Sequence, residues 1–252
     1  MEDLLVHEHE RLDDLILGGM KIIQPRQGYR FSIDAVLVAF FPRLEGVGQV
    51  VDLGTGSGVI PLLLAYRNQN IRITGLEIGE AAVQRARRSA EYNRLSKRIT
   101  ILQGDIKNIG GLLPPGEADL VVSNPPFWKK GEGRVSKDPE QALARHELEI
   151  DLPGIITAAA YLLKAGGSLN MVHRADRREE ILSHLSRQGF HQVRIRRVQS
   201  FPDRQSHLLL VEGRKGPYME LLEMEPLIIY QQAGEYSEEI KGIYGMSPNL
   251  IC

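Results

Sequence analysis

The sequence predicts an α/β fold built on a mostly parallel sheet of seven strands, with helices on both faces. Short apolar runs typical of buried strands alternate with longer helix-like runs along most of the chain. A glycine-rich turn follows the first of these strand-like runs, and the ends of later runs carry acids or an Asn-Pro-Pro sequence. Because parallel strands need crossover connections, this alternation places the carboxyl ends of the strands along one edge of the sheet.

Each element is predicted from its pattern of apolar residues and its flanking turn signals. Near the start, Leu15–Ile23 is expected to form a β-hairpin on the Gly18-Gly19 turn. The predicted strands of the sheet are Val50–Leu53, Ile71–Leu76, Ile99–Leu102, Asp119–Val122, Gly167–His173, Gln192–Val198 and His207–Val211. The predicted helices are Asp34–Phe41, Val59–Tyr66, Leu152–Lys164 and Arg177–Gln188.

The turn Gly54-Thr55-Gly56-Ser57-Gly58 joins a buried strand to a helix and has Asp52 just before it. Glycines at alternate positions let the backbone approach a ligand closely. The dinucleotide fingerprint G-x-G-x-x-G would need a further glycine at position 59 or 61, where the chain has Val and Pro. The loop therefore predicts a cofactor site other than the dinucleotide type.

The next two strands end in carboxylates. Glu77 follows Leu76 and is expected to accept the hydroxyls of a ribose, with Ile78 beside it. Asp105 and Ile106 follow the third strand, where a carboxylate could meet an adenine amine and an isoleucine could cover the ring. Asp105 could equally serve as a helix N-cap.

Ser123-Asn124-Pro125-Pro126-Phe127 ends the fourth strand. Two prolines cannot extend a strand, so the chain turns there and presents Asn124 at the sheet edge. The Asn124 side-chain oxygen and the Pro125 carbonyl are two acceptors suited to a planar group that carries an NH2, and Phe127 offers an aromatic face. Taken alone, Asn-Pro-Pro could also be a simple strand terminator.

These strand-end motifs together resemble those of class I S-adenosylmethionine-dependent methyltransferases, which have a Rossmann-like fold. Asp-x-Gly-x-Gly-x-Gly resembles their motif I, and Asn-Pro-Pro-Phe resembles the motif of the branch that methylates exocyclic base amines or glutamine amides. Further segments, covering residues 12 to 245, resemble the tRNA1(Val) (adenine-37-N6)-methyltransferase family. They are Gln24-Pro25, Gly28–Leu37, Lys129–Arg134, Ala144–Glu147 and Pro226–Tyr230.

The resemblance implies S-adenosylmethionine as cofactor and direct methyl transfer to an amine of RNA, with N6 of a tRNA adenine near the anticodon favoured. Asp34 would then lie near the methionine end of the cofactor. Asn124 and Pro125 would orient the amine, with Pro126 completing the motif and Phe127 stacking on an unpaired or flipped base. The implied cofactor residues are Asp34, Asp52, Gly54, Gly56, Gly58, Glu77, Ile78, Asp105, Ile106 and Asn124.

Charge is unevenly distributed although the formal net charge is −1. Residues 172–215 hold ten Lys or Arg against five Asp or Glu, whereas residues 1–20 hold one Arg against six acids. A basic block in a neutral protein predicts a phosphate-contacting face, although arginines can also simply solvate a surface. The residues expected to bind RNA are Lys129, Lys130, Arg134, Arg145, Arg194, Arg196 and Arg197.

Composition favours one cytoplasmic domain. Its expected parts are an N-terminal hairpin and helix (12–45), a catalytic core (46–215) and a C-terminal extension (216–252). The single cysteine, Cys252, favours a reducing compartment and no thiolate metal cluster, and neither a signal peptide nor a membrane span is expected. The oligomeric state is left open.

Three alternative functions remain open from the sequence: an rRNA guanine-N2 methyltransferase, a protein glutamine methyltransferase, and an RNA-binding protein with an inactive methyltransferase fold. The glutamine enzymes usually carry an N-terminal helical domain, for which the residues before the glycine loop leave no room. The inactive fold is disfavoured because all four strand-end motifs are intact.

Overall fold

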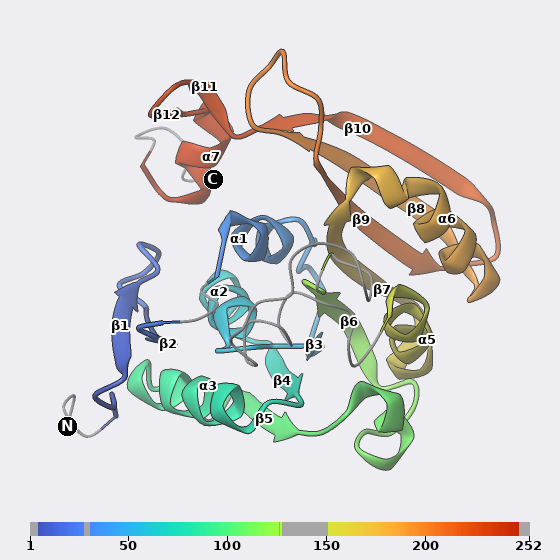
Figure 1. The fold of residues 1–252 in the computed structure, drawn as a ribbon. Coiled ribbons are helices and arrows are strands. Elements are labelled where there is room, and N and C mark those ends of the chain that lie inside the picture. Colours follow the sequence, from blue (N-terminus) through green and yellow to red (C-terminus); the bar gives the residue numbers. More distant parts are fainter. Residues whose placement is uncertain (1–4, 28–30, 126, 128–150, 247–252) are drawn as a thin grey trace.

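The computed structural model describes residues 5–27, 31–125, 127 and 151–246. Across these residues, eight strands form a central sheet in the order β10-β8-β9-β7-β6-β3-β4-β5 (Figure 1). The strands are β3 (Gln49–Leu53), β4 (Arg72–Glu77), β5 (Ile99–Gln103), β6 (Ala118–Ser123), β7 (Leu163–Arg174), β8 (Phe190–Gln199), β9 (Leu208–Lys215) and β10 (Glu220–Ile228). Only β9 among them runs antiparallel to its neighbours, so the sheet is mostly parallel as predicted.

The predicted count of seven strands is wrong, because β10 adds an eighth beside β8. Its sequence is rich in Glu, Leu and Met, which favour helices, and it contains Pro226. The register is irregular between Met224 and Leu227, around this proline. An edge strand tolerates a proline at such an irregularity because no neighbour needs its missing N–H.

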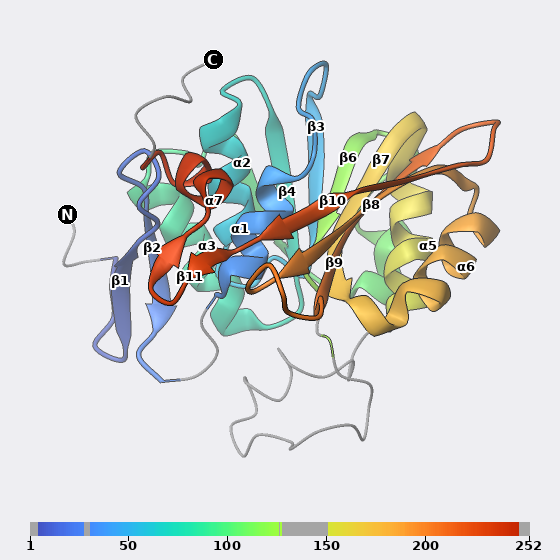
Figure 2. The same ribbon diagram turned by 90° about the horizontal axis from the view of Figure 1, so that it is seen from above.

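Helices cover both faces of the sheet (Figures 1 and 2). Each face of the sheet has its own apolar core, and the strands β3, β4, β6, β7, β8 and β9 contribute residues to both cores because successive residues of a strand point to opposite faces. The first face holds α1 (Ile33–Phe40), α2 (Val59–Arg67) and α3 (Glu80–Tyr92). The second holds α5 (Leu152–Leu162), α6 (Arg178–Arg187) and the 3-10 helix η2 (Ile106–Gly111).

The N-terminal hairpin is present with strands that differ from the prediction. The strands β1 (Glu10–Asp14) and β2 (Lys21–Pro25) pair antiparallel. Leu15 and Leu17, which the prediction placed in the first strand, lie in the connection and are buried. Their alternate apolar positions resemble the pattern of a strand. The first strand of the hairpin, β1, is mostly charged, so its sequence does not predict a strand.

The region after β10, up to Met246, joins the core of the first helical face. After β10 the chain forms the short strands β11 (Tyr230–Gln232) and β12 (Glu235–Tyr236) and the helix α7 (Glu238–Ile243). The rings of Tyr236 and Tyr230 stack with centroids 5.1 Å apart, and Ile240 is buried in the core that contains α1. Figure 1 shows this region beside α1 and the N-terminal hairpin beside α3, both on the same side of the sheet.

Candidate active site

Hydrogen bonds join the carboxyl ends of four adjacent strands. The N–H groups of Gly54 and Thr55 donate to the Leu76 carbonyl at 2.9 and 3.0 Å, which joins β3 to β4. The Gly104 N–H donates to the Glu77 carbonyl at 2.9 Å and joins β5 to β4. On the other side, the buried Ser123 hydroxyl donates to the Leu53 carbonyl at 2.9 Å. The structure thus brings the four predicted motifs together at one edge of the sheet.

The glycine loop has the backbone that the sequence requires. Gly54, Gly56 and Gly58 all have positive φ angles, of 76°, 55° and 90°. A Cβ on Gly58 would lie 3.3 Å from the Cβ of Ala86, so this glycine lets α3 pack closely against the loop. A Cβ on Gly54 or Gly56 would meet nothing within 4 Å. The latter two glycines therefore border open space, where a ligand can approach the backbone.

Asp52 is fully buried on β3, and neither of its carboxyl oxygens accepts a hydrogen bond from the residues that the structure describes. Burial raises the pKa of Asp52 to about 7; the nearby Thr55 hydroxyl opposes this shift and the charge of Glu77 adds to it. An unpartnered carboxyl is costly in an apolar interior. It fits a cofactor that brings a positive or hydrogen-bond-donating group to this loop.

Glu77 supports the loop as well as facing the site. Its two oxygens accept the N–H groups of Gly56 and Gly79, at 2.9 and 2.8 Å. The carboxylate is half-buried, as is Ile78 next to it. Carboxylate oxygens can each accept more than one hydrogen bond, so ribose hydroxyls remain compatible with these contacts.

Asp105 caps the 3-10 helix η2, accepting the Lys107 N–H at 2.8 Å. This is the N-cap role that the sequence left open. It does not exclude a ligand contact, because one carboxylate accepts several donors. Ile106, the first residue of η2, is partly buried against the core of the second helical face.

Asn124, Pro125 and Phe127 follow β6 directly; Pro126 lies outside the described residues. Asn124 is half-buried and Pro125 is buried. The ring of Phe127 lies 5.5 Å from that of His173, with an angle of 55° between the ring planes. His173 is the last residue but one of β7, the neighbouring strand. It could not be selected from the sequence, because a lone histidine near a strand end carries no spacing signal.

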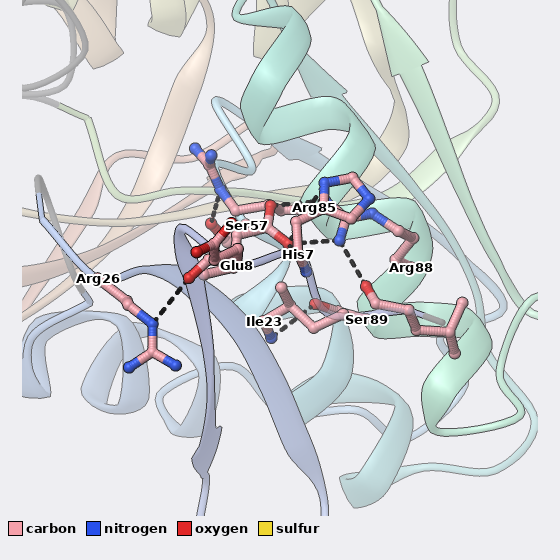
Figure 3. A network of polar contacts seen from close by, with 10 residues as sticks. His7, Glu8, Ile23, Arg26, Ser57, Arg85, Arg88 and Ser89 are labelled. Carbon is pink, nitrogen blue, oxygen red and sulfur yellow. Dashed lines mark hydrogen bonds and ion pairs between the residues drawn. The ribbon is translucent and has the colours of Figure 1, made fainter. Parts of the chain in front are cut away.

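A polar network links the N-terminal hairpin to the glycine loop through α3 (Figure 3). Arg88 pairs with the buried carboxylate of Glu10 at 2.6 Å, and this holds the pKa of Glu10 near 2 even though burial opposes the shift. One turn earlier, the buried Arg85 donates to the Ser57 hydroxyl in the loop at 3.3 Å. Helix α3 therefore contacts the hairpin and the loop at once.

Asp34 lies in the first turn of α1 and accepts the Ser32 hydroxyl at 2.8 Å. Burial raises its pKa, and this hydrogen bond opposes the shift. No contact described for Asp34 involves the strand-end motifs, so its role near the cofactor stays a prediction.

Arg194 and Arg196 on β8 have protein partners. Arg194 pairs with Glu212 at 2.5 Å and lies over the ring of Phe41, 4.4 Å from its centroid. Arg196 binds both carboxylate oxygens of Glu239. These contacts favour a structural role for both arginines over the predicted contact with phosphate. Arg197 lies on the opposite face of β8, since successive residues of a strand alternate.

The remaining predicted RNA-binding residues, Lys129, Lys130, Arg134 and Arg145, lie outside the described residues. The segment that contains them joins Phe127 at the site to Asp151, which caps α5 by accepting the Gly154 N–H at 2.9 Å. Among the helices of the described part of the chain, none is long and apolar enough to cross a membrane.

One group among the described residues has metal-ligand atoms close together: His7, His9 and Glu10, all within 4.8 Å. Its only buried member, Glu10, is already bound by Arg88. A guanidinium on the carboxylate opposes a second cation there. The site at the strand ends does not include this group.

Comparisons with known proteins agree with this geometry. The pattern of the methyltransferase small domain matches residues 33–197. A tRNA1(Val) (adenine(37)-N6)-methyltransferase of Porphyromonas gingivalis is 32% identical over 220 residues, covering 83% of this chain and 85% of that protein.

Solved structures show the same fold. A predicted O-methyltransferase of Agrobacterium tumefaciens superposes with a TM-score of 0.70 at 22% identity, over 84% of this chain and 96% of the other. The 16S rRNA N2 G1207 methyltransferase RsmC of T. thermophilus, solved with AdoMet and guanosine, superposes with a TM-score of 0.58 at 22% identity, over 83% of this chain and 52% of the other. The chain belongs to the methyltransferase small-domain family and is an S-adenosylmethionine-dependent methyltransferase.

Proposed function

We propose that the protein methylates the exocyclic N6 amine of an unpaired adenine in tRNA, at the position immediately 3′ of the anticodon. The observation that supports the proposal is the hydrogen bond from the Ser123 hydroxyl to the Leu53 carbonyl, which joins the residue before Asn124 to the residue before the glycine loop. The Porphyromonas gingivalis relative, whose name specifies this reaction, supports the choice of adenine and tRNA.

The cofactor would be held by the loop between β3 and α2 and by the acids around it. Bound there, S-adenosylmethionine supplies a methyl group on a positively charged sulfur. Gly54 and Gly56 let its body approach the backbone, and Glu77 accepts its ribose hydroxyls. Asp52 provides a buried carboxyl for a donor group, and that group relieves the unpartnered oxygens described above.

The amine would be oriented by acceptors on the turn after β6. The side-chain oxygen of Asn124 and the carbonyl oxygen of Pro125 accept the two N–H groups of the target, which leaves the nitrogen lone pair facing the methyl group. As the bond from nitrogen to the methyl carbon formed, the bond from that carbon to sulfur would break and the cofactor would leave as a neutral thioether. Positive charge would grow on the nitrogen, where the two fixed acceptors would stabilise it, and the extra proton would then pass to solvent water. Alignment of the two reacting atoms then supplies most of the rate enhancement.

A base inside a stacked helix cannot reach this turn, so the target must lie in a loop or be flipped out. Phe127 provides an aromatic face for such a base, and base–aromatic stacking tolerates any base. The hydrogen-bonding partners therefore select an exocyclic amine, while contacts with the rest of the RNA select the nucleotide. The segment between Phe127 and Asp151 holds four cations predicted to make those contacts, Lys129, Lys130, Arg134 and Arg145.

The test is transfer of a labelled methyl group from the cofactor to total RNA, and in a separate reaction to a protein extract, both taken from cells that lack the protein. Nucleoside analysis by mass spectrometry should find new N6-methyladenosine next to the anticodon. Asn124→Ala is the matched control, since it should bind cofactor but transfer little methyl. New N2-methylguanosine in rRNA would instead support the guanine alternative, and cofactor binding without transfer to any RNA or protein glutamine would support an inactive fold.

A further inference from the structure

His173 packs against Phe127, the aromatic residue of the site. Its side chain is completely buried at the end of β7, and its ring lies 5.5 Å from the ring of Phe127. The tilt of 55° between the rings is typical of aromatic pairs that favour contact between the edge of one ring and the face of another. Phe127 itself is only half-buried, so part of its surface remains available to a ligand.

The His173 ring is held in place from its own side. The backbone N–H of Arg174 donates to Nδ1 at 2.8 Å, which leaves the proton of the neutral ring on Nε2. The guanidinium of Arg177 lies 3.3 Å from Nε2 and therefore packs against the ring without donating to it. Arg177 is in turn bound by both oxygens of Glu180, at 2.9 and 2.6 Å. A chain of contacts thus runs from the start of α6 through His173 to Phe127.

The surroundings of His173 also keep it neutral. Burial lowers its pKa to about 3, and the charges of Arg177 and Arg174 act in the same direction, while Glu180 and Asp176 oppose them. With this pKa the ring does not take up a proton in the ordinary working range of pH. It is therefore unsuited to accept the proton that the methylated amine must lose, and its role is to support another residue.

We propose that His173 is a positioning residue that fixes the ring of Phe127 so that it can stack on the target base. This inference rests on the proposed function, in which Phe127 contacts the base. A phenylalanine on a turn would otherwise sample several rotamers, and ordering it when the base binds would weaken binding. A rigid, neutral ring behind it removes that cost without placing a charge next to the base.

The first experiment compares His173→Phe with His173→Leu. Both variants lose the acceptor for the Arg174 N–H, so they share that structural defect, and they differ in whether an aromatic ring faces Phe127. We expect His173→Leu to lower kcat/KM for tRNA about tenfold, mainly through KM, while His173→Phe stays within about threefold of the unchanged protein. Cofactor affinity, measured by calorimetry, should be unaffected in both. Equal losses in the two variants, or a loss of cofactor affinity, would overturn the proposal.

The second experiment is a double-mutant cycle with Phe127→Ala. If His173 acts through Phe127, adding His173→Leu to Phe127→Ala should cause little further loss of kcat/KM. Leu169→Ala is the control, because Leu169 is equally buried on β7 but belongs to the core under α5 and α6. In this control, the fold-losses of kcat/KM caused by Leu169→Ala and Phe127→Ala should multiply in the double variant. If the losses caused by His173→Leu and Phe127→Ala also multiplied, the positioning role would be refuted.

If His173→Leu does not fold, His173→Gln replaces it, since glutamine can still accept the Arg174 N–H while lacking the ring. The activity of the unchanged protein distinguishes a failure of the proposed function from a failure of the positioning role. If the unchanged protein does not methylate tRNA, the proposed function is wrong. An active protein whose His173 variants show no coupling to Phe127 would count against this inference alone.

Discussion

Replacing Asp52 by asparagine should change how the stability of the protein depends on pH. The carboxyl is fully buried, and its pKa rises from 3.8 to about 7 in the folded state. At pH values between these two pKa values, the folded protein therefore keeps a proton on Asp52 that the unfolded chain has released. The contribution of Asp52 to stability is complete below pH 3.8 and is lost as pH rises towards about 7.

The size of this effect follows from the shift. A shift of about three pKa units, at about 1.36 kcal/mol for each unit, corresponds to a loss of roughly 4 kcal/mol in the free energy of unfolding. No discount for solvent screening applies, because Asp52 has no exposed surface. Asp52→Asn is uncharged at every pH, so it should add a constant offset and remove this part of the pH dependence.

The assay is urea unfolding of both proteins at several pH values, without cofactor, with the difference between their unfolding free energies plotted against pH. Asp119→Asn is the control with the opposite sign. Burial opposes the shift, but hydrogen bonds from Lys164 and from the N–H groups of Gln49 and Gly48 lower the pKa of Asp119. Its contribution is therefore present above pH 3.8 and is lost as pH falls. If the curves for the unchanged protein and Asp52→Asn run parallel, the reasoning about the buried carboxyl is wrong.

The other predictions concern cofactor binding, chemistry and the basic block. Gly56→Val forces a residue with a side chain to adopt a positive φ at the open face of the loop, and Glu77→Gln removes the charge that holds the loop. Each variant should weaken cofactor binding by more than about tenfold in calorimetry. If both affinities were unchanged, the assignment of the cofactor site would be wrong. Asn124→Ala should lower the methylation rate by about a hundredfold while leaving cofactor affinity intact, and an unchanged rate would exclude the proposed role. Arg194→Gln should lower the free energy of unfolding by roughly 2 kcal/mol, because it leaves the buried Glu212 without this partner. Arg196→Gln should cost less than about 1 kcal/mol, because Glu239 is exposed. Both variants should leave the salt dependence of RNA binding unaltered, and a flatter dependence in either would support the predicted phosphate contact.

The strand ends could be predicted because local physics defines them. Alternating glycines, a carboxylate directly after an apolar run and two consecutive prolines each restrict the backbone within a few residues. Parallel pairing then brings such ends together, as the register of Leu53 with Leu76 and Ser123 confirms. The hydrogen bond from Ser123 on β6 to Leu53 on β3 could not be predicted, since it depends on which strand lies next to β6.

The sequence was least informative where long-range partners decide the outcome. The composition of β10 favours a helix, yet pairing with β8 makes it a strand. The basic residues of β8 look like a phosphate-binding surface in the sequence, but Glu212 and Glu239, distant in the chain, neutralise two of them. The contact of His173 with Phe127 depends on the pairing of β7 with β6, which the sequence near His173 does not indicate.

The position of β9 between β7 and β8 affects the order in which the sheet can be completed. In the described part of the chain, β8 pairs only with β9 and β10, and both follow it in the sequence. A growing chain that ends at Arg197, where the match to the family domain ends, leaves β8 without a strand to pair with. That side of the sheet must therefore wait until Lys215, the last residue of β9, has been synthesised. A fragment cut to the boundaries of the family domain would leave β8 unpaired, with the apolar side chains of Val193 and Ile195 no longer covered, and would be prone to aggregate.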